Sequence, residues 1–173
     1  MKGDASLFAA IDLGSNAFRM MIGQSVRGRQ GFVIQEVKTL REPVRLAEGF
    51  QGGALDELAL DRGWQALARF GKKLRGFEAG RVRAVATSAV READNAQLFL
   101  ASAERHLGFR IDVISGHEEA RLVYAGVAHT IPGTENRRLV VDIGGGSTEL
   151  ILGQGAQPLM TESIAIGLSL IHI

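Results

Sequence analysis

The chain contains no cysteine, and its 173 residues include only three prolines, one tryptophan and one tyrosine. Without cysteine the protein forms no disulfide framework, which fits a reducing interior, and we expect it to be cytoplasmic. The four histidines show no metal-ligand spacing, and the absence of cysteine removes the other common zinc ligand. A zinc site is therefore not expected.

Neither sign of charge dominates, because 20 basic residues face 19 acidic ones and the net charge is +1. No basic run is present, which argues against nucleic acid as a partner. No apolar stretch reaches the length of a signal peptide near the start or of a membrane span later, so we expect no membrane partner. Apolar residues make up 46% of the chain, which indicates a folded, globular protein.

Two stretches of the sequence are alike: IDLGSNAFRMMIGQ at residues 11–24 and VDIGGGSTELILGQ at residues 141–154. Each is an apolar strand that ends in an aspartate, Asp12 or Asp142, turns through glycine and small polar residues, and leaves as a second apolar strand. A single copy is compatible with any tight hairpin. Two copies of equal length, with the acid at the same point, predict two phosphate-binding loops that face one cleft.

Glycine suits such loops because it reaches positive φ angles, so that several backbone N–H groups point at one spot and form an anion-binding nest. The absent Cβ also lets phosphate oxygens approach the chain. The expected backbone donors are Gly14, Ser15 and Asn16 in the first loop and Gly144, Gly145, Gly146 and Ser147 in the second. The serine hydroxyls are expected to bind phosphate and not to act as nucleophiles, because no His–Asp partner pattern accompanies them.

The two aspartates cannot bind phosphate directly, since like charges repel. We expect Asp12 and Asp142 to hold Mg²⁺, directly or through its water shell, so that the metal neutralises the phosphate oxygens. Glu149 would assist if the strand after the second loop faces the cleft. The alternative is that each aspartate only bonds the backbone of its own turn.

The periodicity predicts one complete α/β lobe with a mixed sheet and flanking helices, followed by the start of a second. The expected strands and helices of the first lobe are residues 7–13, 18–24, 32–39, 56–74, 82–86, 94–108, 111–114 and 118–129, with a loop or irregular edge at 41–50. Three further strands at 139–143, 149–153 and 158–166 repeat the opening. We place the lobes at 1–132 and 133–173, with the linker at 132–136, and expect the apolar faces of the incomplete second sheet to be uncovered and to favour self-association.

Several motifs in order, ATSAVREADN, VISGHEEARLVYAGV and VVDIGGGSTEL, resemble the Ppx/GppA family of exopolyphosphatases and guanosine pentaphosphate phosphohydrolases. The resemblance covers residues 8–167, whereas the final LSLIHI departs from the family pattern and carries no functional inference. It implies a ribonuclease H-like fold of the actin, sugar-kinase and Hsp70 superfamily, and a homodimer for the full-length protein. It also implies Mg²⁺-dependent hydrolysis of polyphosphate or of pppGpp, without distinguishing the two.

Glu119 is the candidate general base. Glu118 has the spacing of a capping box with Ser115 and so has a structural role, whereas Glu119 has none. Glu119 opens a helix after the carboxyl end of a strand, where ligands collect in related sheets. It also matches the catalytic glutamate of the family, whose role is to take a proton from the attacking water. The alternative is a solvated glutamate that is favourable in the first turn of a helix.

A second phosphate contact is predicted at the start of the helical segment Thr87-Ser88-Ala89-Val90-Arg91. A cation is unfavourable in a first helical turn unless an anion lies nearby, so Arg91 and the helix start at Ser88 are candidates to bind a substrate phosphate. The alternative is an ion pair of Arg91 with Glu92 or Asp94. Arg19 is a weaker candidate, expected to line the first loop.

Two other functions use the same sequence features. A nucleotide-dependent kinase of the same superfamily would share both loops and transfer phosphate to an acceptor. A non-catalytic module, either alarmone-binding or actin-like, would bind in the same cleft without turnover. Because the second lobe is expected to be incomplete, we expect the 173-residue chain itself to be inactive.

Overall fold

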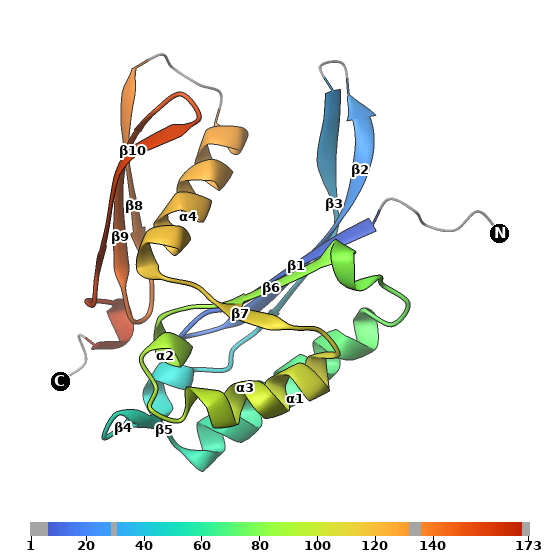
Figure 1. Cartoon of the computed structure of the whole chain (residues 1–173), viewed down its shortest axis with the longest axis vertical. Coiled ribbons are helices and arrows are strands. Elements are labelled where there is room, and N and C mark those ends of the chain that lie inside the picture. Colours follow the sequence, from blue (N-terminus) through green and yellow to red (C-terminus); the bar gives the residue numbers. More distant parts are fainter. Residues whose placement is uncertain (1–6, 29–30, 132–135, 171–173) are drawn as a thin grey trace.

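The computed structural model describes residues 7–28, 31–131 and 136–170, which form two sheets with flanking helices (Figure 1). The first sheet has the strand order β3-β2-β1-β6-β7. Strands β1 to β3 are antiparallel neighbours, and β6 and β7 run parallel to β1. Its strands are β1 (Leu7–Leu13), β2 (Phe18–Gly28), β3 (Gly31–Glu42), β6 (Val82–Ala86) and β7 (Ile111–Val113). The predicted mixed α/β sheet is therefore present.

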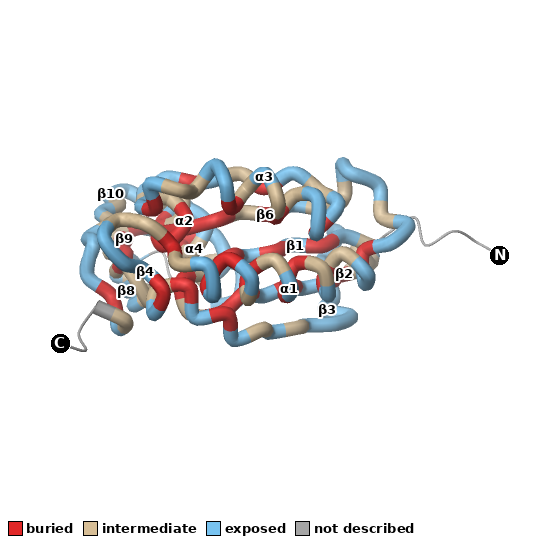
Figure 2. Tube along the Cα trace, turned by 90° about the horizontal axis from the view of Figure 1, so that it is seen from below, coloured by how far each residue is buried: buried red, intermediate tan, exposed pale blue. Residues whose placement is uncertain are grey.

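Helices α1 (Glu57–Lys73) and α3 (Ala96–Leu107) cover one face of this sheet and close the main core (Figures 1 and 2). Asp56 caps α1 by accepting a hydrogen bond of 2.7 Å from the N–H of Ala59. Gly108 ends α3 in the left-handed conformation, with φ of 83°, as the sequence predicted. Three short elements, η1 (Leu46–Gly49), β4 (Phe50–Gln51) and β5 (Ala54–Leu55), precede α1, and two more, η2 (Ala79–Arg81) and α2 (Ser88–Arg91), lie between α1 and α3.

The second sheet has the order β10-β9-β8 and is antiparallel throughout. It consists of β8 (Arg137–Ile143), β9 (Thr148–Gln154) and β10 (Gln157–Ile164), and the short η3 (Leu168–Leu170) follows it. Helix α4 (Gly116–Thr130) packs against this sheet, where Ala120 and Tyr124 bury themselves against Ile151. Tyr124 also donates a hydrogen bond of 3.1 Å to the carbonyl of Gly155.

The position of α4 differs from the sequence interpretation, which grouped this helix with the first lobe. The helix follows β7 in the chain, but its apolar residues face the second sheet. Element order alone does not say which sheet a helix covers, so the sequence could not show this packing. The lobe boundaries at 1–132 and 133–173 stay predictions. Most of the expected linker, residues 132–135, lies outside the described residues.

Three local predictions also need correction. Strand β3 continues to Glu42, so Arg41 belongs to the sheet and not to a loop. The helix expected at 94–108 begins at Ala96; the side chain of Asn95 just before it bonds the backbone of Leu55 at 2.8 and 3.0 Å and makes no capping hydrogen bond. At α4, Ser115 accepts the capping hydrogen bond from the N–H of Glu118, but the Glu118 carboxylate pairs with Arg121.

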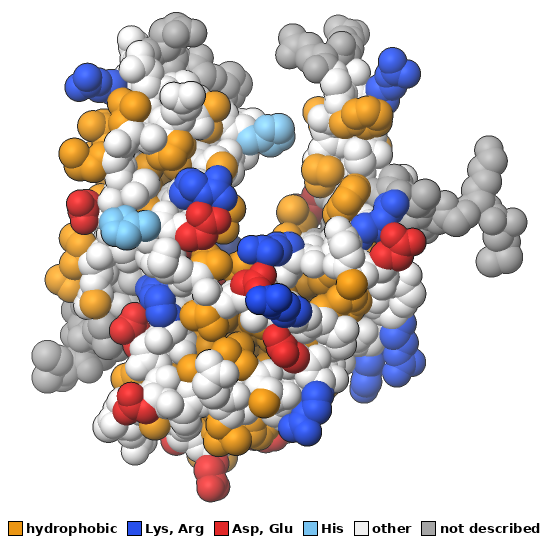
Figure 3. Space-filling model, viewed as in Figure 1, with side chains coloured by type: hydrophobic (Ala, Val, Ile, Leu, Met, Phe, Trp, Pro, Cys, Tyr) orange, Lys and Arg blue, Asp and Glu red, His pale blue; other side chains and the backbone are white. Residues whose placement is uncertain are grey.

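A notch separates α4 from the β2–β3 hairpin (Figures 1 and 3). A groove here is floored by the open face of the first sheet, including Ala10 and Met21, and walled by Arg121 and Leu122 of α4. None of the helices in the described ranges is long and apolar enough to cross a membrane.

Only one face of the second sheet is uncovered, because α4 covers the other. The exposed apolar side chains on the uncovered face are Leu139, Val141, Ile143, Met160 and Ile164. We expect Val141→Lys to reduce self-association, seen as a lower apparent mass in size-exclusion chromatography, with stability changed by less than about 0.5 kcal/mol.

The neighbouring Val140 provides the matched control, since it points to the opposite face and packs against the α4 cluster. Val140→Lys places an unpaired charge in that cluster, so it should destabilise the second sheet in thermal unfolding. Equal effects of the two substitutions would contradict the assignment of the faces.

Candidate active site

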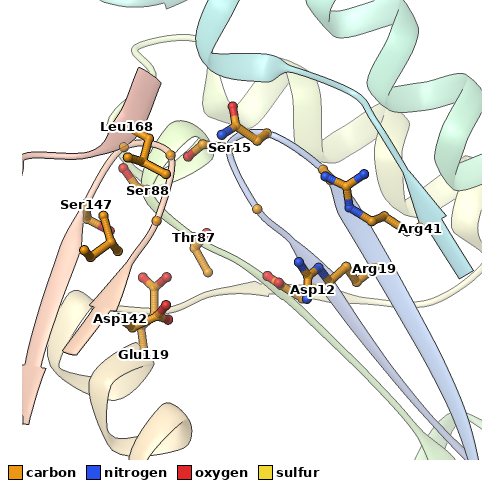
Figure 4. Close-up of a pocket in the computed structure, with 17 residues that line it drawn as sticks. Asp12, Ser15, Arg19, Arg41, Thr87, Ser88, Glu119, Asp142, Ser147 and Leu168 are labelled. Atoms are coloured by element: carbon orange, nitrogen blue, oxygen red, sulfur yellow. The ribbon is translucent and has the colours of Figure 1, made fainter. Parts of the chain in front are cut away.

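The turn after β1 and the turn after β8 meet over one pocket of about 340 Å³ (Figure 4). Most residues singled out from the sequence line it: Asp12, Gly14, Ser15, Asn16, Arg19, Ser88, Glu119, Asp142, Gly144, Gly145, Gly146 and Ser147. The lining is completed by five residues that were not predicted from the sequence: Ala17, Arg41, Thr87, Ile143 and Leu168. The similar stretches of the chain therefore face one cavity, as predicted.

The glycines of the second loop allow the two loops to touch. A Cβ on Gly145 would lie 3.0 Å from the Cβ of Ser15 and from Nδ2 of Asn16. A Cβ on Gly146 would collide with the hydroxyl of Ser88 and lie 3.2 Å from that of Ser15. Any larger residue would therefore push the loops apart.

The predicted positive φ angles are absent from both loops. Gly14, Gly144, Gly145 and Gly146 all keep ordinary backbone angles, so the reasoning from left-handed glycine was wrong. The N–H of Gly144 bonds the carbonyl of Ser147 at 2.8 Å, which removes one expected phosphate donor. The other predicted donors, the N–H groups of Gly14, Ser15, Asn16, Gly145, Gly146 and Ser147, have no acceptor among the described residues and are available to an anion.

The first loop is held from behind by two short helices. The hydroxyl of Ser15 accepts a hydrogen bond of 3.2 Å from the N–H of Ala89 in α2. The carbonyls of Ser15 and Asn16 accept from Ala47 at 3.1 Å and from Arg45 at 2.8 Å, on the η1 side. The Ser15 hydroxyl thus has a structural partner in α2.

Asp12 and Asp142 lie on opposite walls of the pocket (Figure 4). Burial raises the pKa of Asp12 above its ordinary value; the charge of Arg19 opposes this rise and the charge of Asp142 adds to it. The two aspartates are therefore close enough to repel each other. A cation between them would relieve this repulsion.

Glu149 lies next to Asp142 on the neighbouring strand, facing it in the β8–β9 register. Its side chain is fully buried, and Oε1 accepts a hydrogen bond of 2.9 Å from the hydroxyl of Ser163. Oε2 is buried and has no hydrogen-bond partner in the described structure. Glu149 does not line the pocket directly.

The predicted metal ligands do not form a ready-made cage. In the ranges that the structure describes, no three acidic, histidine or cysteine side chains are arranged to hold a metal ion. Mg²⁺ commonly keeps several waters and takes only one or two carboxylates from the protein. Asp12 and Asp142, with the unsatisfied oxygen of Glu149 behind them, fit a cation held largely through its waters.

Glu119 projects from the first turn of α4 beside Asp142 (Figure 4). Burial raises its pKa to about 7, and the charges of Glu149 and Asp12 add to the rise, whereas the hydrogen bond from Arg91 opposes it. A carboxylate that titrates near neutrality is well matched to accept a proton at physiological pH.

Arg91 contacts Glu119 and does not line the pocket. Its Nη1 donates to Oε2 of Glu119 at 3.2 Å and to the carbonyl of Ile114 at 3.0 Å, while Nε pairs with Glu92 at 3.2 Å. The ion-pair alternative, with Glu92, is therefore the arrangement present here. Arg91 ties the proposed base to α2 and to the end of β7.

Residues 22–172 match the sequence model of the Ppx/GppA phosphatase family. The chain belongs to this family. It is 34% identical to the PPX-GPPA enzyme of Aquifex aeolicus, with a TM-score of 0.80 over 94% of this chain and 53% of that one. It is 30% identical to an exopolyphosphatase from Cytophaga hutchinsonii, with a TM-score of 0.86 over 96% of this chain and 54% of that one.

The Ppx/GppA chain thus spans about half the length of the solved structures that it matches. The ethanolamine utilization protein EutJ from Carboxydothermus hydrogenoformans shares the fold at 17% identity, with a TM-score of 0.50. The predicted α/β fold, a mixed sheet with flanking helices followed by three strands of a second sheet, is confirmed.

Arg41 is the charged pocket residue that sequence reasoning missed in this Ppx/GppA chain. It pairs in register with Arg19 on β2, and Arg19 pairs in register with Asp12 on β1. The three side chains form a row across the sheet (Figure 4). Extending the third strand three residues beyond Thr39, to its observed end, would have placed Arg41 opposite Arg19.

The raised pKa of Glu119 predicts a pH-dependent stability. An ordinary glutamate titrates near 4.5, so the folded protein, in which the pKa is about 7, holds this proton more tightly than the unfolded chain does. The tighter binding of this proton therefore adds to the free energy of unfolding. The full gain is present below about pH 4.5 and is lost as the pH rises through about 7. The loss amounts to about 3 kcal/mol.

Glu119→Gln removes this titration. We expect the free energy of unfolding of the variant, relative to wild type, to rise by about 3 kcal/mol between about pH 5 and about pH 8 in urea denaturation. Asp12 also has a raised pKa and so contributes to the pH dependence of stability. This contribution is present in both proteins and cancels to first order in the difference between them. A difference that does not change with pH would contradict the assignment.

Proposed function

We propose that this chain carries the catalytic cleft of a phosphoanhydride hydrolase, which releases the terminal phosphate of polyphosphate or the 5′ γ-phosphate of pppGpp. Membership of the Ppx/GppA phosphatase family supports phosphatase chemistry in general. The observation that carries the proposal is the half-buried carboxylate of Glu119, which titrates near neutrality and faces a pocket formed by two glycine-rich loops.

In the proposed complex the terminal phosphate lies between the loops. The N–H groups of Gly145 and Gly146 are available on one side, and the guanidinium groups of Arg19 and Arg41 on the other. Fixed donors and cations of this kind stabilise the negative charge that spreads over the phosphoryl oxygens in the transition state. The close contact between the loops keeps the donors in place before substrate arrives.

Mg²⁺ would be held by Asp142 and Asp12, with Glu149 as a further acceptor for its waters. When bound, the ion would neutralise phosphate oxygens that these carboxylates would otherwise repel. The orphaned oxygen of Glu149 and the mutual repulsion of the two aspartates are the features that favour a cation here.

Glu119 would accept the proton of a water that attacks the terminal phosphorus. Arg91 would hold the carboxylate in place through its hydrogen bond, because the same guanidinium group is anchored on the carbonyl of Ile114. In this proposal Arg91 acts on the base and does not bind substrate.

In this proposal the described pocket binds only the terminal phosphate of the substrate. Both candidate substrates present such a group, so the choice between polyphosphate and pppGpp stays open in the proposal. The homodimer, the cytoplasmic setting and the inactivity of the 173-residue chain on its own stay predictions.

The proposal predicts Mg²⁺-dependent phosphate release from long-chain polyphosphate or pppGpp by a version of the protein extended through a complete second lobe. Glu119→Gln in that version should lower the rate by roughly 10²–10⁴-fold, because the water loses its general base. Phosphate release is measured colorimetrically with and without Mg²⁺.

Glu118→Gln is the matched control, since Glu118 is the adjacent residue and its carboxylate pairs with Arg121 outside the pocket. It should leave the rate nearly unchanged. An unchanged rate in Glu119→Gln would refute the role of the base. No release from either substrate would favour a kinase, tested with ATP and an acceptor, or a non-catalytic binding module.

A further inference from the structure

The environment of Glu149 is asymmetric. One carboxylate oxygen, Oε1, accepts a hydrogen bond from Ser163, whereas the other, Oε2, is buried without a partner in the described structure. A buried carboxylate oxygen without a partner carries the full cost of its lost hydration. We therefore expect a ligand from outside the protein to bind Oε2 of Glu149.

The Ser163 hydroxyl is held in place by its surroundings. Ser163 lies on β10 directly opposite Glu149 in the β9–β10 register. On its other side it meets Gly116, the first residue of α4, where a Cβ would collide with both the Cβ and the hydroxyl of Ser163. The side chain is thus packed between β9 and the helix start that carries Glu119.

Thr161 provides a second hydroxyl on this face of β10, and in the described structure this hydroxyl does not bond a carboxylate. It lies two residues before Ser163 on the same face of the strand, also against the start of α4. Its hydroxyl is 3.1 Å from Nδ1 of His117, and in the described residues it makes no hydrogen bond to Glu149. The link between hydroxyl and carboxylate is therefore specific to Ser163.

We propose that Ser163 is a positioning residue, whose hydroxyl fixes one oxygen of Glu149 so that the other is presented to a hydrated divalent cation beside Asp142. The inference rests on the proposed function for the presence of that cation. Groups that bond and orient metal-binding carboxylates typically change metal affinity by 10–100-fold when they are removed.

The test measures binding of Mn²⁺ alone to the 173-residue chain by electron paramagnetic resonance, because Mn²⁺ prefers the same oxygen ligands as Mg²⁺. Ser163→Ala should weaken Mn²⁺ binding by roughly 10–100-fold. Thr161→Ala, the matched control, should leave it unchanged. In a Glu149→Gln background, Ser163→Ala should have no further effect, because the carboxylate on which it acts is gone.

Thermal unfolding of each variant separates loss of the fold from loss of the metal. If Ser163→Ala does not fold, Ser163→Cys replaces it, since it keeps a side chain of similar size with only a weak donor and should also weaken Mn²⁺ binding. Unchanged affinity in the folded serine variant would overturn the inference and leave the proposed function standing. A wild-type chain that binds no Mn²⁺ would overturn the inference together with the metal site, whereas hydrolysis itself is decided by phosphate release.

Discussion

The contact between the two glycine-rich loops is the constraint on which the candidate active site depends. Gly145 lies against Ser15 and Gly146 against Ser88, at distances that leave no room for a Cβ. This contact brings the aspartates at the ends of β1 and β8 to opposite walls of one pocket. The glycines therefore act by allowing two segments of the chain to approach closely. The small side chains of Ser15 and Ser88, which they meet, are as necessary as the glycines themselves.

Helix α4 connects the fold to the chemistry. It leaves the end of β7 in the first sheet, packs on the second sheet, and carries Glu119 in the turn where it crosses between them. The base therefore lies between the sheets, where burial and the nearby acids raise its pKa. Arg91 bonds both Glu119 and the carbonyl of Ile114, just after β7. Ser163 of β10 packs against Gly116 at the start of α4.

The sequence predicted the strands, the two loops and most of the pocket, because alternation, glycine turns and paired aspartates are local signals. It did not reveal which sheet α4 covers, since helix packing depends on contacts between residues far apart in the chain. Arg41 was missed because its role follows from strand register and not from its neighbours in sequence. The hydrogen bond from Arg91 to Glu119 joins residues 28 positions apart, so the sequence could not reveal it, and a contact of Arg91 with substrate stays a prediction. A buried carboxylate oxygen without a hydrogen-bond partner, such as Oε2 of Glu149, is visible only in three dimensions.

The most direct test of a single phosphate site formed by both loops is a titration of the ¹⁵N-labelled chain with pyrophosphate, followed by NMR with and without Mg²⁺. The account predicts that the amide signals of Ser15, Gly145 and Gly146 shift together, with one apparent affinity, and that Mg²⁺ strengthens the binding. Gly126, on an open stretch of α4, should not shift and serves as the internal control. Shifts confined to one loop, or none in either, would contradict it.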